Sequence, residues 1–123
     1  MYKFWGKVRT HNKRGKKLGF PTVNVNLTKD IPEGIYISKT KIKNKIYSSL
    51  TFLGIAKTFN EKRFHSETFI LDFNKSIIGE WISLELLKKI RDNKKFNSAK
   101  ELITQMKEDE KYARKYFKSS DPC

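Results

Sequence analysis

Residues 34–53 read GIYISKTKIKNKIYSSLTFL and give the clearest indication of fold class in the chain. Gly34–Ile42 and Ile46–Leu53 predict two strands that are joined by a turn at Lys43-Asn44-Lys45. In the second arm the residues alternate between two sets with a period of two, which is the period of a strand. This stretch therefore predicts a β-hairpin.

Other extended segments lie on both sides of the predicted hairpin. In residues 22–27 valine and leucine alternate with threonine and asparagine, which predicts a strand with one buried face. A basic loop at 10–20 and a looser segment at 57–65 interrupt the pattern. Further strands are predicted at residues 2–9, 67–73 and 80–90.

The last third of the chain predicts a helix. Ser98 and Glu101 have the spacing of a capping box, and apolar residues then recur at helical spacing from Ala99 to Phe117. Residues 119–123 are expected to form a flexible tail. About six short strands followed by one helix favour a closed or nearly closed antiparallel barrel, because closure removes exposed strand edges.

Composition limits the classes of protein to which the chain can belong. The 123 residues suffice for one domain, and no apolar run approaches the ~20 residues of a membrane span. Cys123 is the only cysteine, which excludes an intrachain disulfide and fits a cytoplasmic protein. The net charge of +14 attracts polyanions, but it comes mostly from lysines spread along the chain. We therefore expect neither a membrane nor a nucleic acid as partner.

Thr22 and Asn24 are candidate metal ligands. On an extended chain, residues two apart point to the same face, and a hydroxyl and an amide oxygen suit Mg²⁺. The preceding residues 14–19 combine glycines with lysines, as a phosphate-binding loop would, although they are no Walker motif. The alternative is a solvated basic turn followed by an ordinary strand.

Glu67 is a candidate general base. It shares a strand face with Phe69, Leu71 and Phe73, which we expect to point into the barrel. A carboxylate at the start of that stripe would lie half desolvated at the barrel mouth, an environment that favours proton uptake. The alternative is that Glu67 marks only the place where the strand meets water.

Two further features involve aromatic side chains. Arg91 is suited to pairing with an anion and Phe96 to stacking on a planar ligand. The alternative is that Arg91 lies at the surface and Phe96 fills the gap under the helix. Trp5 and Trp81 are expected to pack in the core or at its rim.

Taken in order, several motifs in residues 6–117 resemble those of the riboflavin kinase (flavokinase) family. The stretch RGKKLGFPTVN at 14–24 looks like the family hallmark, and GIY at 34–36, GIAKTF at 54–59 and ETFILDF at 67–73 follow. Leu102, Gln105, Asp109 and Ala113-Arg114 are similar to the helix motif of the family. The LGFPTxN run is specific, and the shared order strengthens the resemblance.

The resemblance implies a mainly β fold, a six-stranded antiparallel Greek-key β-barrel with a C-terminal α-helix, in which residues 1–118 form the kinase domain. It implies transfer of the γ-phosphate of ATP to the 5′-hydroxyl of riboflavin, giving FMN and ADP with the help of Mg²⁺. By resemblance, Glu67 is the catalytic base, Thr22 and Asn24 hold the metal, Gly15, Lys16, Gly19, Pro21 and Thr22 bind the nucleotide, and Arg91 and Phe96 bind the flavin.

Some positions depart from the family pattern. His11, Lys57, Phe69 and Asn93 stand where glycine, proline, histidine and glutamate are usual. The changes at His11, Lys57 and Asn93 leave open a flavin- or nucleotide-binding module that has lost turnover. A basic β-barrel that binds nucleic acid is the other alternative. Most bacterial relatives also carry an FMN adenylyltransferase domain, so the chain is either free-standing or part of a longer FAD synthetase, and FAD synthesis is not expected from it.

Overall fold

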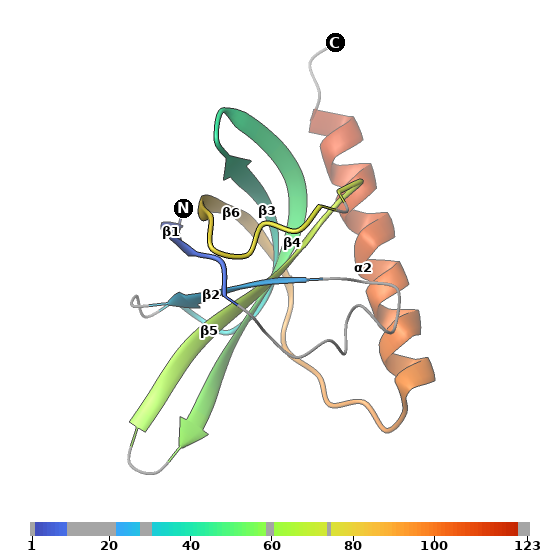
Figure 1. The fold of residues 1–123 in the computed structure, drawn as a ribbon. Helices are drawn as coiled ribbons and strands as arrows, with labels where there is room; N and C mark the ends of the chain where they lie inside the picture. Colours follow the sequence, from blue (N-terminus) through green and yellow to red (C-terminus); the bar gives the residue numbers. More distant parts are fainter. Residues whose placement is uncertain (1, 10–21, 28–30, 59–60, 74, 121–123) are drawn as a thin grey trace.

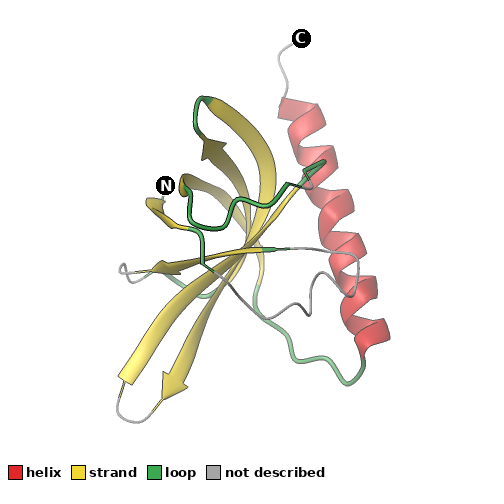
Figure 2. Cartoon of the chain, in the orientation of Figure 1, coloured by secondary structure: helices red, strands yellow, loops and turns green. Residues whose placement is uncertain are grey.

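The structure is a computed structural model, which describes residues 2–9, 22–27, 31–58, 61–73 and 75–120. Within these ranges six strands form one sheet and one helix follows them (Figures 1 and 2). All strand pairs are antiparallel, in the order β1-β6-β3-β4-β5-β2. The elements are β1 (Lys3–Lys7), β2 (Val23–Leu27), β3 (Gly34–Ile42), β4 (Lys45–Thr58), β5 (Glu61–Ile70), β6 (Trp81–Arg91) and α2 (Ala99–Ser120).

The two outer strands of this sheet, β1 and β2, meet and nearly close it into a barrel. Two residues after β1, Arg9 forms a bridge with Asn24 of β2, and the Arg9 amide donates to the Asn24 carbonyl oxygen at 3.0 Å. This bridge satisfies backbone groups that would otherwise form an open edge. The six-stranded antiparallel barrel expected from the sequence is confirmed.

The predicted hairpin is confirmed with a two-residue turn. β3 and β4 pair from Gly34↔Leu53 to Ile42↔Lys45, and Lys43 in the turn has a positive φ of 57°. The prediction that residues 57–65 form a loose segment is wrong, because β4 and β5 pair as far as Thr58↔Glu61. In Figure 1 the two strands project beyond the barrel. Alternation marks only strands with one buried face, so backbone pairing beyond the core leaves no such pattern.

Apolar side chains form two separate cores, one on each side of the sheet. The inner core fills the barrel, with Phe4, Val25, Leu53 and Leu84 among its buried members. The outer core lies between the barrel and α2 and consists of Ile35, Ile37, Leu50, Leu71 and Ala113, with Phe52, Phe69, Leu87, Ile90, Tyr116 and Phe117 packed against them.

This division corrects two expectations from the sequence. Phe69 and Leu71 were expected inside the barrel, but they belong to the outer core, and the inward positions of β5 are taken by Thr68 and Ile70. Glu67 therefore lies on the helix-facing side of the sheet. The alternation has the predicted period, but a period of two does not say which of the two faces is the interior.

Inside the barrel, five buried hydroxyl groups form a continuous hydrogen-bonded chain across three strands. Thr40 pairs with Ser49 at 2.8 Å, Ser49 with Ser38 at 2.7 Å, Ser38 with Thr51 at 2.8 Å, and Thr51 with Thr68 at 3.0 Å. In the described residues no buried side-chain polar atom lacks a partner. These hydroxyls are therefore compatible with a dry interior, since each bond offsets the cost of burial.

The helix begins and docks largely as its sequence predicts. The Glu101 amide donates to Ser98 Oγ at 3.2 Å, while the Glu101 carboxylate accepts from the Asn97 amide at 3.0 Å. The cap is thus a variant of the predicted capping box, displaced by one residue at its acidic end. The helix extends to Ser120, so two residues predicted in the tail are helical. It is not long and apolar enough to span a membrane, and the described part holds no other helix.

A second contact fixes the C-terminal half of α2. Ala113 is fully buried against the sheet, and the next residue, Arg114, donates to both carboxylate oxygens of Asp72 at 3.1 and 3.0 Å. The Arg114 guanidinium lowers the pKa of the Asp72 carboxyl below its ordinary value. The Ala-Arg dipeptide therefore combines close packing with a paired charge beyond the end of β5.

Gly6 marks a close approach between β1 and β2. A Cβ at this position would overlap Cγ1 of Val25, which is 1% exposed and has no room to move. We expect Gly6→Ala to lower the free energy of unfolding by about 1–3 kcal/mol, the usual effect of overpacking, when measured by urea denaturation. Gly54→Ala is the control, since its Cβ would make an ordinary 3.5 Å contact with the His65 ring. Equal loss of stability in both variants would contradict the assignment.

Candidate active site

One row of side chains crosses the helix-facing side of five strands and joins the separate sequence candidates. Asn24 pairs directly with Glu67, Glu67 with Phe52, Phe52 with Ile35, and Ile35 with Arg91. Residues that lie opposite each other in an antiparallel pair project to the same side of the sheet. The predicted base and one predicted metal ligand are therefore cross-strand neighbours, with Arg91 at the far end of the row.

The Asn24 end of the row is polar and half-buried. Asn24 and Glu67 are both partly exposed, whereas Val25 beside Asn24 points into the inner core. Thr22 comes directly before β2, two residues from Asn24, and is only 9% exposed. An amide, a carboxylate and a hydroxyl thus gather near one end of the sheet row. The other nucleotide-loop candidates, Gly15, Lys16, Gly19 and Pro21, lie outside the described residues.

Arg91 connects the end of β6 to α2. Its Nε and Nη2 donate to the two carboxylate oxygens of Asp109 at 2.9 and 2.7 Å, and Nη1 donates to the Asp92 carbonyl oxygen at 3.1 Å. The side chains of Arg91 and Asp109 are 13% and 3% exposed. Gln105 also donates to Asp109, at 3.0 Å. All three guanidinium nitrogens of Arg91 thus make protein contacts, and a flavin-binding role stays a prediction.

Asp109 and Gln105 contact the predicted site residue Arg91 or its partner, but they were not predicted as site residues from the sequence. Their signal is visible in the helix pattern: Met106, Asp109 and Ala113 are spaced three and four apart, so Asp109 occupies a position in the buried stripe. An acidic residue in an apolar stripe requires a paired charge. The sequence could therefore have shown that Asp109 needs a partner, but not that the partner is Arg91.

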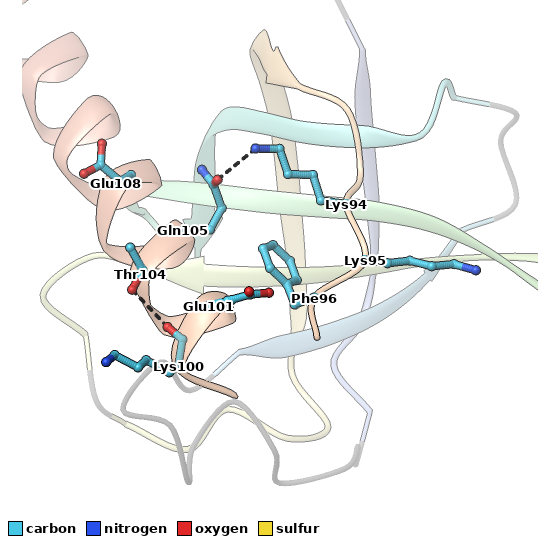
Figure 3. Close-up of a pocket in the computed structure, with 8 residues that line it drawn as sticks. All are labelled: Lys94, Lys95, Phe96, Lys100, Glu101, Thr104, Gln105 and Glu108. Atoms are coloured by element: carbon cyan, nitrogen blue, oxygen red, sulfur yellow. Dashed lines mark hydrogen bonds between the residues drawn. The ribbon is translucent and has the colours of Figure 1, made fainter. Parts of the chain in front are cut away.

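A pocket of about 440 Å³ lies between the segment after β6 and the first turns of α2 (Figure 3). Phe96 is half-buried there, and Figure 3 shows its ring beside Gln105 of the helix. Lys94 Nζ donates to Gln105 Oε1 at 3.1 Å, which joins this segment to the helix residue that also contacts Asp109. The lining residues are Lys94, Lys95, Phe96, Lys100, Glu101, Thr104, Gln105 and Glu108.

The pocket offers an aromatic ring together with three lysines and two glutamates. Such a lining suits a planar ligand that carries polar or anionic groups, since the ring can stack and the ammonium groups can pair. Phe96 lines this pocket, and its stacking on a flavin stays a prediction.

Asn93 takes a defined structural part in the same segment. Its Nδ2 donates to the Leu53 carbonyl oxygen at 3.0 Å and to Glu33 Oε2 at 3.1 Å. A glutamate carboxylate, which is usual at this family position, has no proton to donate to the carbonyl. The departure from the family pattern is therefore accompanied by a bond that ties the segment to the end of the β3–β4 pairing.

Comparison with known proteins decides the family. A family model described as riboflavin kinase (flavokinase) matches residues 1–117. The chain belongs to the riboflavin kinase family. This confirms the resemblance found in the sequence motifs, and the mainly β barrel with its C-terminal helix agrees with it.

The chain matches the kinase part of longer relatives. The bifunctional riboflavin kinase/FMN adenylyltransferase of Bacillus subtilis (strain 168) is 38% identical over 112 residues, which are 86% of this chain and 35% of the relative. A Streptococcus pneumoniae structure described as a macrolide-efflux protein has a TM-score of 0.85 at 34% identity and covers 91% of this chain and 38% of its own. The chain thus spans little more than a third of either relative.

A further riboflavin kinase structure supports the fold alone. The enzyme from Trypanosoma brucei has a TM-score of 0.66 at 20% identity, and the match covers 96% of this chain and 80% of that chain. This likeness agrees with the barrel and the C-terminal helix described above.

Proposed function

We propose that this chain is an ATP:riboflavin 5′-phosphotransferase, which converts riboflavin and ATP into FMN and ADP. The observation that carries the proposal is the direct cross-strand pairing of Asn24 with Glu67 in a member of the riboflavin kinase family. A carboxylate beside neutral oxygen ligands is the arrangement that phosphoryl transfer to a hydroxyl requires. Residues 1–118 act as one kinase domain, and a cytoplasmic location, expected from the lone cysteine, belongs to the same proposal.

In the proposed reaction Glu67 is the general base. Its carboxylate takes the proton of the riboflavin 5′-hydroxyl while that oxygen bonds to the γ-phosphorus, and the bond from this phosphorus to the β–γ bridging oxygen breaks to release ADP. The half-buried position of Glu67 supports this role, because it leaves the carboxylate accessible to a substrate on one side. Gly15, Lys16, Gly19 and Pro21, with Thr22, are proposed to hold the ATP phosphates.

Thr22 and Asn24 would hold the divalent metal, Mg²⁺ in this proposal. Their hydroxyl and amide oxygens are hard neutral donors, so the charge that balances the metal would come from the phosphates of ATP. When bound, the metal supplies charge neutralisation at the transferred phosphoryl group. Among the described residues no three His, Cys, Asp or Glu side chains lie close enough to form a metal site of their own.

The flavin is proposed to lie toward the other end of the row. Phe96 would stack on the ring system of the flavin. Arg91 would hold the segment after β6 in position through its hydrogen bonds with Asp109. This division gives the aromatic residue the contact with substrate and gives the arginine a supporting part.

Asn24→Ala is expected to raise the Mg²⁺ concentration needed for half-maximal rate by about tenfold, which corresponds to roughly 1.4 kcal/mol of lost binding. The measurement is the rate of FMN formation across a Mg²⁺ titration at saturating ATP. Asn26→Ala is a matched control, since Asn26 lies on the same strand face but pairs with His65 instead of Glu67. An unchanged titration for Asn24→Ala would remove this residue from the metal shell.

The test of the function is FMN formation from riboflavin, ATP and Mg²⁺, followed by chromatography with fluorescence detection. Multiple turnovers per protein molecule are expected. Tight binding of riboflavin without FMN would instead favour the binding module that has lost turnover, and the departures at His11, Lys57 and Asn93 would then be the first positions to revert. Assays with other nucleoside triphosphates in place of ATP define the phosphate donor.

A further inference from the structure

A face of the barrel away from α2 carries two large aromatic side chains in water. Trp5 on β1 is 69% exposed and Trp81 on β6 is 65% exposed, whereas their neighbours Phe4 and Ile82 are buried. The expectation that both tryptophans pack in the core or at its rim is therefore wrong, because each occupies an outward position of its strand. Exposed aromatics that gather on one face indicate an interaction surface.

The strand register brings the two tryptophans together with lysines. Lys7 pairs with Trp81, Trp5 with Ser83, and Ser83 with Lys41 of β3. Trp5 and Trp81 are thus diagonal neighbours on adjacent strands, a relation in which aromatic side chains reach each other. We call the surface formed by Trp5, Lys7, Lys41 and Trp81 the tryptophan face.

The charge around the tryptophan face has one dominant sign. At the outward positions of β1, β6 and β3 away from the helix, the described charged residues are four lysines and one glutamate. The glutamate, Glu85, forms an ion pair in which its Oε2 lies 3.4 Å from Lys3 Nζ. The remaining ammonium groups belong to Lys7, Lys39 and Lys41. A second copy of this face would bring like charges together, so self-association is disfavoured.

We propose that the tryptophan face binds single-stranded nucleic acid. Stacking of bases on exposed aromatic rings and pairing of phosphates with lysines are the two interactions by which β-barrels hold single strands without reading sequence. Both are available here within a single cross-strand neighbourhood. The composition alone argued against such a partner because the lysines are spread along the chain, and only the register reveals that they gather around the tryptophans.

The two tryptophans lie away from the end of the candidate active site that carries Arg91 and Phe96. Trp81 begins β6 and Arg91 ends it, so the tryptophans lie at the opposite end of that strand from Arg91. At the other end of the row, Arg9, two residues after Lys7, pairs with Asn24, so Lys7 is close to the proposed metal ligand. Figure 1 shows β1 on the side of the barrel away from α2, which borders the pocket around Phe96. Neither tryptophan is among the residues proposed for the kinase reaction, so the Trp5→Ala/Trp81→Ala variant should keep FMN formation and tests the proposal independently of that reaction.

The chain provides its own probe, because it has two tryptophans and both lie on this face. Titration with an oligo-uridine of about 12 nucleotides, within the usual site size, is expected to quench the intrinsic tryptophan fluorescence. By anisotropy of a labelled oligonucleotide, Trp5→Ala/Trp81→Ala should weaken binding at least about fivefold, the effect expected for loss of one stacked base. FMN formation and thermal unfolding of the same variant check that the barrel is intact.

A charge-matched pair of variants separates this face from the general positive charge. Lys7→Gln/Lys41→Gln and Lys107→Gln/Lys111→Gln remove the same number of charges, but the second pair lies at exposed positions on α2. The first pair should reduce the magnitude of the slope of log K against log salt concentration, where K is the association constant for the oligonucleotide, by roughly 0.7 per lysine, and the second pair should leave the slope unchanged.

Three results would each overturn the proposal. They are equal effects of the two pairs, oligonucleotide binding without fluorescence quenching, and equal affinity for a duplex of the same length. Loss of a dimer in the tryptophan variant, with no oligonucleotide binding by the wild type, would overturn it in favour of self-association.

Discussion

Replacing Glu67 by glutamine is expected to lower the rate of FMN formation by about 10²-fold or more, the usual contribution of a general base. Glutamine keeps the size of the side chain and its position opposite Asn24, but it cannot accept the proton of the 5′-hydroxyl. Affinity for ATP should survive, since the nucleotide residues proposed here precede β2. Single-turnover assays together with equilibrium binding of ATP measure the two effects separately.

Glu85→Gln is the matched control for this substitution. Glu85 is also a partly exposed glutamate in the middle of a strand, but it lies on β6, which pairs with β1 and β3 and not with β2 or β5, and it forms an ion pair with Lys3. Its replacement should leave the rate of FMN formation within about twofold of wild type. Full activity of Glu67→Gln would reject Glu67 as the base, and comparable losses in both variants would point to a general effect of charge removal.

Asp109→Ala is expected to produce the largest loss of stability, about 3 kcal/mol in the free energy of unfolding. The Asp109 carboxylate is 3% exposed and accepts from two nitrogens of Arg91 and from Gln105, so its removal leaves a largely buried guanidinium unpaired. Urea denaturation measures the effect. Because Arg91 and Gln105 border the segment that carries Phe96, the KM for riboflavin should rise as well.

Asp92→Ala is the control for the Asp109 variant. The Asp92 carboxylate is 88% exposed and lies 2.7 Å from the Lys89 ammonium, whose hydrogen bond lowers the pKa of the Asp92 carboxyl. A solvated pair of this kind contributes little to stability, so the variant should unfold like the wild type. The double variant Arg91→Met/Asp109→Leu should recover most of the stability lost in Asp109→Ala, because it leaves no buried charge. Failure to recover would show that the aspartate acts through something other than Arg91.

Much of the fold could be predicted from sequence because most strands have one buried face. The hairpin of β3 and β4, the strand at Val23–Leu27 and the apolar stripe of α2 all show a clear period. The part of β4 and β5 that projects beyond the barrel does not, and it was predicted as loose chain. Hydrogen bonds between backbones hold it, and these leave no trace in the side-chain pattern.

The residues of the candidate site could be predicted from the sequence, but their arrangement in space could not. The motifs identify Asn24, Glu67 and Arg91, but the pairing that aligns them in one row depends on the register of five strands. Sequence reasoning also placed the stripe of Phe69 and Leu71 inside the barrel, since alternation distinguishes two faces without assigning them. In a barrel with a helix packed outside, both faces of a strand are apolar, and only the tertiary structure tells them apart.

The hydroxyl chain inside the barrel has a consequence for attempts to change the substrate. Ser38, Ser49 and Thr51 occupy the interior of the same strands whose opposite side carries the proposed catalytic row, so enlarging that interior would not enlarge the binding site. Replacing one of these hydroxyl side chains by an apolar one would leave the neighbouring hydroxyl without a hydrogen-bond partner. The hydroxyl side chains would therefore have to be replaced together. Directed evolution toward altered flavins should therefore succeed through the helix-facing residues and the pocket around Phe96, while libraries aimed at the barrel lining should yield mainly unfolded protein.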